Sequence, residues 1–119
     1  MRRDLNQRTK QFALQIIKLY QSLPKSTVAQ IIGNQVLRSG TSVGEHYREA
    51  NRSRSNAELI SKIEVGLQEL EETVYWLELL VESNTIQSIQ INAILGEANE
   101  LNAILTACVK TAKTRKIDH

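Results

Sequence analysis

The sequence is poor in cysteine, proline, glycine and aromatic residues. Its 119 residues include one cysteine, one proline and five glycines, and aromatic residues make up 4%. A single cysteine, Cys108, cannot form an internal disulfide, which excludes a secreted domain stabilised by disulfides. A β-sandwich of this length needs many turns, and the residues that form them are scarce. The composition therefore favours an all-α protein with a single domain over 1–119.

Long apolar runs are also lacking. No stretch approaches the ~18 uninterrupted apolar residues of a membrane span. The first residues, Met1-Arg2-Arg3-Asp4, lead into a mixed segment and not into the apolar core of a signal peptide. We therefore expect a cytoplasmic protein that does not contact a membrane.

Four segments have the apolar periodicity of amphipathic helices, which predicts an up-down-up-down four-helix bundle. Asp4 is the expected N-cap of the first helix, and Ser55 with Glu58 forms a capping box before the third. The helices are expected at about 4–22, 27–51, 56–82 and 88–113. In the last two, apolar residues alternate at steps of three and four: Ile60, Ile63, Leu67, Leu70, Val74, Leu77 and Val81, then Ile91, Ile94, Ala98, Leu101, Leu105, Cys108 and Ala112.

Small residues interrupt the second predicted helix. Each glycine in a helix interior costs about 1 kcal/mol relative to alanine, so the Ser39–Gly44 stretch could break the helix. We expect continuity, because the apolar period carries across the stretch. Gly33, Gly40 and Gly44 would let a neighbouring helix approach closely, and the same small surface could instead admit a ligand.

The net charge of +2 hides a strong asymmetry along the chain. Residues 1–62 hold eleven Lys/Arg against four Asp/Glu, residues 63–109 hold eight Glu and no Lys/Arg, and residues 110–119 hold four Lys/Arg against one Asp. In the predicted topology, the basic segments meet at one end of the bundle. Such an end either contacts phosphates or consists simply of polar termini and loops. The candidate phosphate-binding residues are Arg2, Arg3, Arg48, Arg52, Arg54, Lys62, Lys110, Lys113, Arg115 and Lys116.

One stretch of the third helix, residues 75–81, is apolar nearly all round. Trp76, Leu79 and Leu80 flank the apolar stripe that contains Leu77 and Val81. Such a segment must be buried from more than one direction. It is either a wide core stripe or a subunit interface, and we predict an oligomer interface through Trp76, Leu79 and Leu80.

Two strings of residues carry a family resemblance. They are Arg38-Ser39-Gly40-Thr41-Ser42-Val43-Gly44 and Tyr75-Trp76-Leu77-Glu78-Leu79-Leu80. With the residues around them they resemble the small bacterial proteins of the 23S rRNA intervening-sequence family. The resemblance extends from Phe12 to about Lys110.

The resemblance implies an all-α bundle assembled as a homopentameric barrel. It also implies an architecture similar to that of the accessory proteins of diversity-generating retroelements, which bind nucleic acid and a reverse transcriptase. The expected partners are therefore further copies of the chain, RNA or DNA, and a reverse transcriptase or another protein.

The sequence offers little for catalysis or for a metal. His46 and His119 are the only histidines, and a di-iron bundle would need Glu-x-x-His pairs that point inward. His46 is expected on a helix surface, and Cys108 in the core as a small hydrophobic residue. We expect no catalytic residues, no metal and no cofactor. The remaining interpretations are a non-enzymatic nucleic-acid-associated module and a protein scaffold without a nucleic-acid function.

Overall fold

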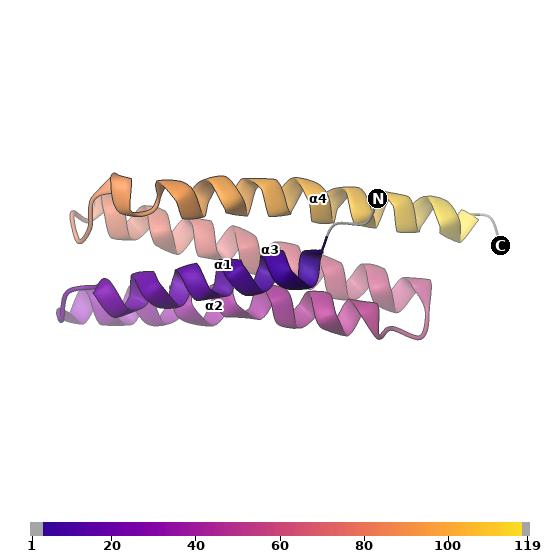
Figure 1. The fold of residues 1–119 in the computed structure, drawn as a ribbon, viewed down its shortest axis with the longest axis horizontal. Coiled ribbons are helices and arrows are strands. Elements are labelled where there is room, and N and C mark those ends of the chain that lie inside the picture. Colours follow the sequence, from indigo (N-terminus) through magenta and orange to yellow (C-terminus); the bar gives the residue numbers. More distant parts are fainter. Residues whose placement is uncertain (1–3, 118–119) are drawn as a thin grey trace.

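The computed structural model describes residues 4–117. They form four α-helices and one short 3-10 helix, and they contain no strand, which confirms the all-α prediction. The elements are α1 (Leu5–Ser22), α2 (Thr27–Asn51), α3 (Asn56–Glu82), η1 (Ser88–Gln90) and α4 (Asn92–Ile117). Successive α-helices run antiparallel in a body of 53 × 22 × 21 Å (Figure 1). No helix within residues 4–117 is long and apolar enough to span a bilayer.

Side chains cap the first three helices at the predicted kinds of residue. The Ser55 hydroxyl accepts a hydrogen bond from the Glu58 backbone N–H at 3.1 Å. The Glu58 carboxylate, however, accepts from the N–H of Arg54 and not from that of Ser55. The remaining cap bonds run from Gln7 N–H to Asp4 and from Ala29 N–H to Ser26. Each cap satisfies backbone donors that the first turn leaves without a partner.

The connection between α3 and α4 differs from the predicted continuous start at Ser88. Residues 88–90 form a 3-10 turn, and α4 begins at Asn92. The Gln90 side chain accepts the backbone N–H of Gln87 at 3.0 Å, and this bond stabilises the tighter turn. Ile86 and Ile91 are buried on either side of η1, so the connection is anchored to the core.

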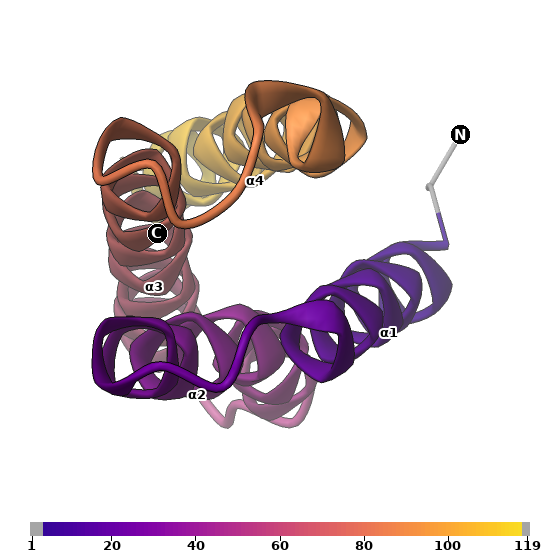
Figure 2. The ribbon, with the colours of Figure 1, turned by 90° about the vertical axis from the view of Figure 1, so that its left-hand side faces the viewer.

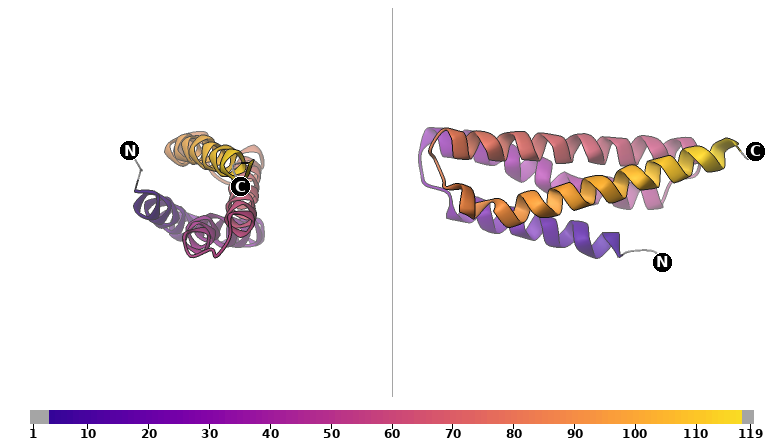
Figure 3. Two further views of the ribbon diagram at one scale, coloured as in Figure 1. Left: turned by 90° about the vertical axis from the view of Figure 1, so that its right-hand side faces the viewer. Right: turned by 90° about the horizontal axis from the view of Figure 1, so that it is seen from above.

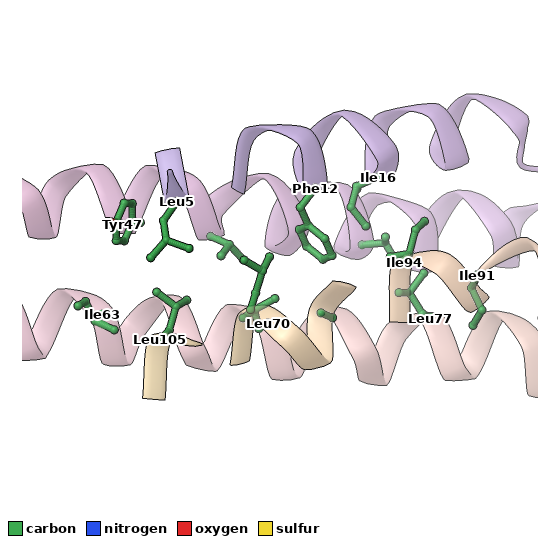
Figure 4. Packing of buried hydrophobic residues seen from close by; sticks show 14 of the residues in the cluster. Leu5, Phe12, Ile16, Tyr47, Ile63, Leu70, Leu77, Ile91, Ile94 and Leu105 are labelled. Carbon is green, nitrogen blue, oxygen red and sulfur yellow. The ribbon is translucent and has the colours of Figure 1, made fainter. Parts of the chain in front are cut away.

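The core lies between the helices along most of the body. Fully buried side chains from all four α-helices meet there, Val36 and Val43 among them from α2. Figure 4 labels Phe12, Ile16, Leu70, Leu77 and Leu105. The packing runs in sequence order from α1 to α2, α3 and α4, which leaves the side between α1 and α4 open (Figure 2). Toward the end at which α4 terminates, α4 lies over α3 and away from α1 (Figure 3).

The three glycines singled out in α2 all lie against residues 9–23. A Cβ placed on Gly40 would lie 2.7 Å from Ile16 Cγ1, and one on Gly33 would lie 2.6 Å from Leu23 Cδ1. At Gly44 the nearest atom would be Thr9 Oγ1, at 3.0 Å. The α2 helix is continuous through these positions, as predicted. The glycines thus bring α1 and α2 closer than larger residues would allow.

Candidate nucleic-acid interface

The basic end of the molecule is the end at which α2 and α4 terminate and α3 begins. Arg48 lies in the last turn of α2, Arg52 is its C-cap residue, and Arg54 belongs to the connection that leads to α3. Arg52 and Arg54 end up at this position because α2 stops at Asn51 and α3 is capped at Ser55. The α4 helix adds Lys110, Lys113 and Arg115 from its last turns.

Five of these cations are available to a ligand. Their side chains are exposed, and none makes an ion pair with a residue in the described part of the chain: Arg48, Arg52, Arg54, Lys110 and Arg115. Glu45 and Glu49, one turn from Arg48 and Arg52, could have neutralised them. Glu49 instead contacts Lys62 and His46.

Two predicted phosphate-binding residues have carboxylate partners. Lys62 Nζ lies 3.2 Å from Glu49 Oε1, and Lys113 Nζ lies 3.7 Å from Glu64 Oε2. The hydrogen bonds from Lys62 and, second, from His46 lower the pKa of the Glu49 carboxyl. Glu49 therefore stays ionised to a lower pH than a free glutamate, and its charge is available to Lys62. These two lysines are poorer candidates for phosphate contacts than the five unpaired cations.

The start of α1 contributes less to the basic end than the topology suggested. Arg2 and Arg3 lie outside the described residues, as does the side chain of Lys116. The start of α1 is set back from the ends of α2 and α4 (Figure 1). Arg8, in its first turns, faces α4 and bonds to Glu97 at 2.7 Å and Glu100 at 2.9 Å. These hydrogen bonds raise the pKa of Arg8 and join α1 to α4.

Carboxylates occupy the middle and the opposite end of α3. Arg38 of α2 forms ion pairs with Glu69 and Glu72 on α3. Further toward the end of α3, Glu78 and Glu82 are exposed. Lys18 and Lys25 are exposed toward the same end as Glu78 and Glu82, so the unpaired positive charge gathers at the basic end while the opposite end carries both signs.

His46 lies between two carboxylates. Its Nδ1 is 3.4 Å from Glu49 Oε1, and its Nε2 is 3.8 Å from Glu69 Oε2. Within residues 4–117, no group of three His, Cys, Asp or Glu residues is arranged to hold a metal ion. Its contacts make His46 a part of the contact between α2 and α3.

Of the three residues predicted at an oligomer interface, Leu80 is buried within the single chain. Leu80 has no exposed surface and belongs to the core, because its side chain points inward between the helices. Trp76 and Leu79 are partly exposed, and Tyr75, which contacts the Trp76 ring edge-on, is 54% exposed. The Trp76 Nε1–H is buried and has no acceptor within the described residues.

Two further apolar residues on α2 were not predicted. Val28 is 49% and Ile31 60% exposed. Ile31 precedes Arg38 by seven residues, so the two lie on the same side of α2. Arg38 in turn contacts Glu72, one turn from Trp76 on α3. We call this surface, formed by Val28, Ile31, Tyr75, Trp76 and Leu79, the apolar face; the sequence held no signal for it, because Val28 and Ile31 have the spacing of a buried helix face.

Comparisons with known proteins show the family of this chain. A sequence model described as 23S rRNA-intervening sequence protein matches residues 2–107. The chain is also similar to a crystal structure, at 1.70 Å resolution, of a protein with unknown function from the S23 ribosomal protein family of Bacteroides thetaiotaomicron VPI-5482. The two are 36% identical with a TM-score of 0.83, over 88% of this chain and 97% of that one. No curated protein matches the chain.

The class defined by the fold is therefore a small all-α protein with four helices, a basic end and an exposed apolar face. The chain belongs to the 23S rRNA-intervening sequence protein family.

Proposed function

We propose that this protein is a non-enzymatic, oligomeric binding protein that associates with RNA through its basic end. The observation that carries the proposal is the group of five exposed cations without carboxylate partners at that end. The family's description, which refers to a sequence within 23S rRNA, makes RNA the favoured polyanion. The binding experiment below also tests whether the protein prefers DNA.

The contacts would be made to phosphates and not to bases. Arginine and lysine side chains position a protein on a nucleic-acid backbone without reading its sequence. Specific recognition of single-stranded RNA commonly uses aromatic side chains on which bases stack. Tyr47 is the aromatic residue nearest in sequence to Arg48, and it is 7% exposed. We therefore expect strong dependence on salt and little preference among sequences.

The apolar face supports self-association, which we propose gives a homopentameric barrel. Tyr75 and Ile31 expose large apolar side chains, and the buried Trp76 N–H has no acceptor in the described residues. A neighbouring subunit would cover the Tyr75 and Ile31 side chains, whereas the Trp76 N–H is already enclosed by its own chain. Closed rings use heterologous contacts, in which the apolar face meets a different surface of the next copy. Several basic ends could then engage one polyanion together.

Replacement of Arg48, Arg52 and Arg54 by alanine is expected to weaken RNA binding at low salt by about tenfold or more. Each lost phosphate contact also lowers the slope of log affinity against log salt by ~0.7 for a single strand, so the triple variant loses about two units. Fluorescence anisotropy with two unrelated RNA oligonucleotides, and with DNA oligonucleotides of the same sequences, from low to physiological salt, measures both quantities.

The matched control removes three exposed lysines elsewhere: Lys10, Lys18 and Lys25. This variant has the same net charge as the arginine triple variant, and its RNA affinity is expected to change far less. Equal losses in the two variants would mean that net charge and not the basic end attracts RNA. If the wild-type protein binds no RNA at low salt, the alternative function is favoured, a scaffold for other proteins without a nucleic-acid function. Tighter binding of DNA than of RNA would reassign the polyanion.

Trp76→Asp is expected to convert the oligomer into monomers, because it places a charge in an apolar contact. Sedimentation velocity of the wild type and the variant at equal concentrations measures the change. Ala103→Asp, at an exposed position of α4, is the control and should leave the assembly intact. A wild-type protein that sediments as a monomer over the full concentration range would refute the assembly.

A further inference from the structure

A hollow of about 660 Å³ lies at the basic end, on the open side of the molecule. All four α-helices contribute to it, and it is not part of the apolar face. The residues that line it are Leu5, Tyr47, Asn51, Leu59, Ile63, Ile104, Ala107, Cys108, Thr111 and Arg115.

The hollow exists because α1 is short. It has 18 residues, against 25 in α2, 27 in α3 and 26 in α4. Seven residues fewer than α2 correspond to about two helical turns. Over this length residues 4–117 form three helices, and among these residues no fourth helix contacts the inward faces of α2, α3 and α4. Leu5, at the start of α1, forms the inner wall.

The chemistry of the hollow differs between floor and rim. The floor is apolar, with contributions from Leu59, Ile63 and Ile104. Cys108, expected in the core, is partly exposed here, and Val109 takes the buried position instead. The rim carries Arg115, which is exposed and makes no ion pair with a described residue.

Other polar groups also lie around the rim. Asn51 and Thr111 line it, and neither side chain hydrogen-bonds to a described residue. Asp4 precedes Leu5 but does not line the hollow, and one of its carboxylate oxygens accepts the cap bond from the Gln7 N–H. The one charged side chain among the lining residues is therefore Arg115, next to an apolar floor.

We propose that this hollow binds a short amphipathic helix of a partner protein, which continues the line of α1. Aliphatic side chains of that helix fill the floor, and a carboxylate at its edge pairs with Arg115. The missing length suits about two turns, and a helix that buries an apolar stripe in a groove is a common mode of recognition. RNA fits less well, because phosphates and riboses gain nothing from the apolar floor. The site goes beyond the proposed RNA association, since it takes a protein partner.

Cys108 provides the test, because it lines the hollow and is the only cysteine in the chain. The probe is a synthetic, blocked peptide of about four helical turns, with leucines at i, i+3, i+4 and i+7 and glutamates beside them. Saturating peptide is expected to slow the reaction of Cys108 with a thiol reagent by about tenfold or more. The same peptide with lysine in place of glutamate is expected to protect far less.

Two tryptophan variants separate the hollow from the rest of α4. Ala107→Trp fills the hollow from its exposed rim and should abolish binding of the labelled peptide, whereas Ala103→Trp, also exposed on α4, should not. Far-ultraviolet circular dichroism verifies that both variants remain helical. The Arg48/Arg52/Arg54 variant should bind the peptide as the wild type does, even if RNA binding proves absent.

Four results would overturn the proposal. The first is equal protection by the two peptides, or none by either. The second is protection by RNA as strong as that by the acidic peptide. The third is a Cys108 rate that falls as the protein is concentrated, which would place a second copy in the hollow. The fourth is a failure of Cys108 to react with the thiol reagent, without peptide, at any protein concentration. That result would mean that the chain itself closes the hollow.

Discussion

Gly40→Leu is expected to lower the free energy of unfolding by about 1–3 kcal/mol. The added Cβ alone would lie 2.7 Å from Ile16 Cγ1, and all three of its nearest contacts are atoms of Ile16. Ile16 is fully buried, so it has no solvent-side rotamer into which it can withdraw. Leucine gains about 0.8 kcal/mol over glycine in helix propensity, which offsets only part of the strain. Urea denaturation at one fixed protein concentration measures the difference.

Gly96→Leu provides the control. Gly96 is exposed on α4, and a Cβ there would meet nothing within 4 Å. The substitution should therefore raise stability by about 0.5–1 kcal/mol through helix propensity alone. A Gly40→Leu protein as stable as the wild type would show that α1 and α2 can separate at little cost. The small residues of α2 would then serve something other than close packing, such as the ligand site considered from the sequence.

The burial pattern of α3 shows which buried positions the apolar periodicity predicts and which it misses. Ile60, Ile63, Leu70 and Leu77 are buried as predicted. The expected positions Leu67, Val74 and Val81 are only partly buried, and their preceding neighbours are buried in their place: Gly66, Thr73 and Leu80. At Gly66 and Thr73 the buried stripe is thus rotated toward α2, whose residues lie against both positions.

The reason for the rotation is the contact between α2 and α3. Thr73 is fully buried, and its hydroxyl lies 2.8 Å from that of Ser39 on α2. The carbonyls of Glu69 and Val36 also accept from Thr73 and Ser39, so both hydroxyls have partners inside the core. A pattern read from apolar residues does not register a glycine or a hydroxyl residue as buried, because their burial depends on the partner helix.

The sequence predicts which basic residues gather at the basic end, but not which of them have carboxylate partners. Helix order brings the ends of α2 and α4 together, and this followed from the sequence. The ion pairs depend on side-chain positions across helices, so the spacing along one helix could not identify Lys62 with Glu49 or Lys113 with Glu64. The length of α1 relative to its neighbours, and with it the hollow, likewise became visible only in three dimensions.

Leu80→Ala is expected to destabilise the protein by about 2–5 kcal/mol, which is the cost of a cavity left by a fully buried leucine. Leu80 has no exposed surface, and its carbonyl also accepts the backbone N–H groups of Thr85 and Ile86 beyond the helix end. The substitution keeps these backbone bonds, so the loss measures packing alone. Denaturant unfolding at a fixed protomer concentration is required, because self-association contributes to apparent stability.

Leu79→Ala separates the core from the apolar face. Leu79 is partly exposed beside Leu80 on the same turn of α3. Its truncation should cost about 1 kcal/mol or less in the isolated chain. It should instead weaken self-association, because an apolar side chain at the centre of an interface loses its contacts in the next subunit. Sedimentation velocity on dilution should then show that Leu79→Ala dissociates before the wild type, while Leu80→Ala remains assembled as long as it is folded. Dissociation of Leu80→Ala without loss of helical signal would return Leu80 to the interface and contradict its place in the core.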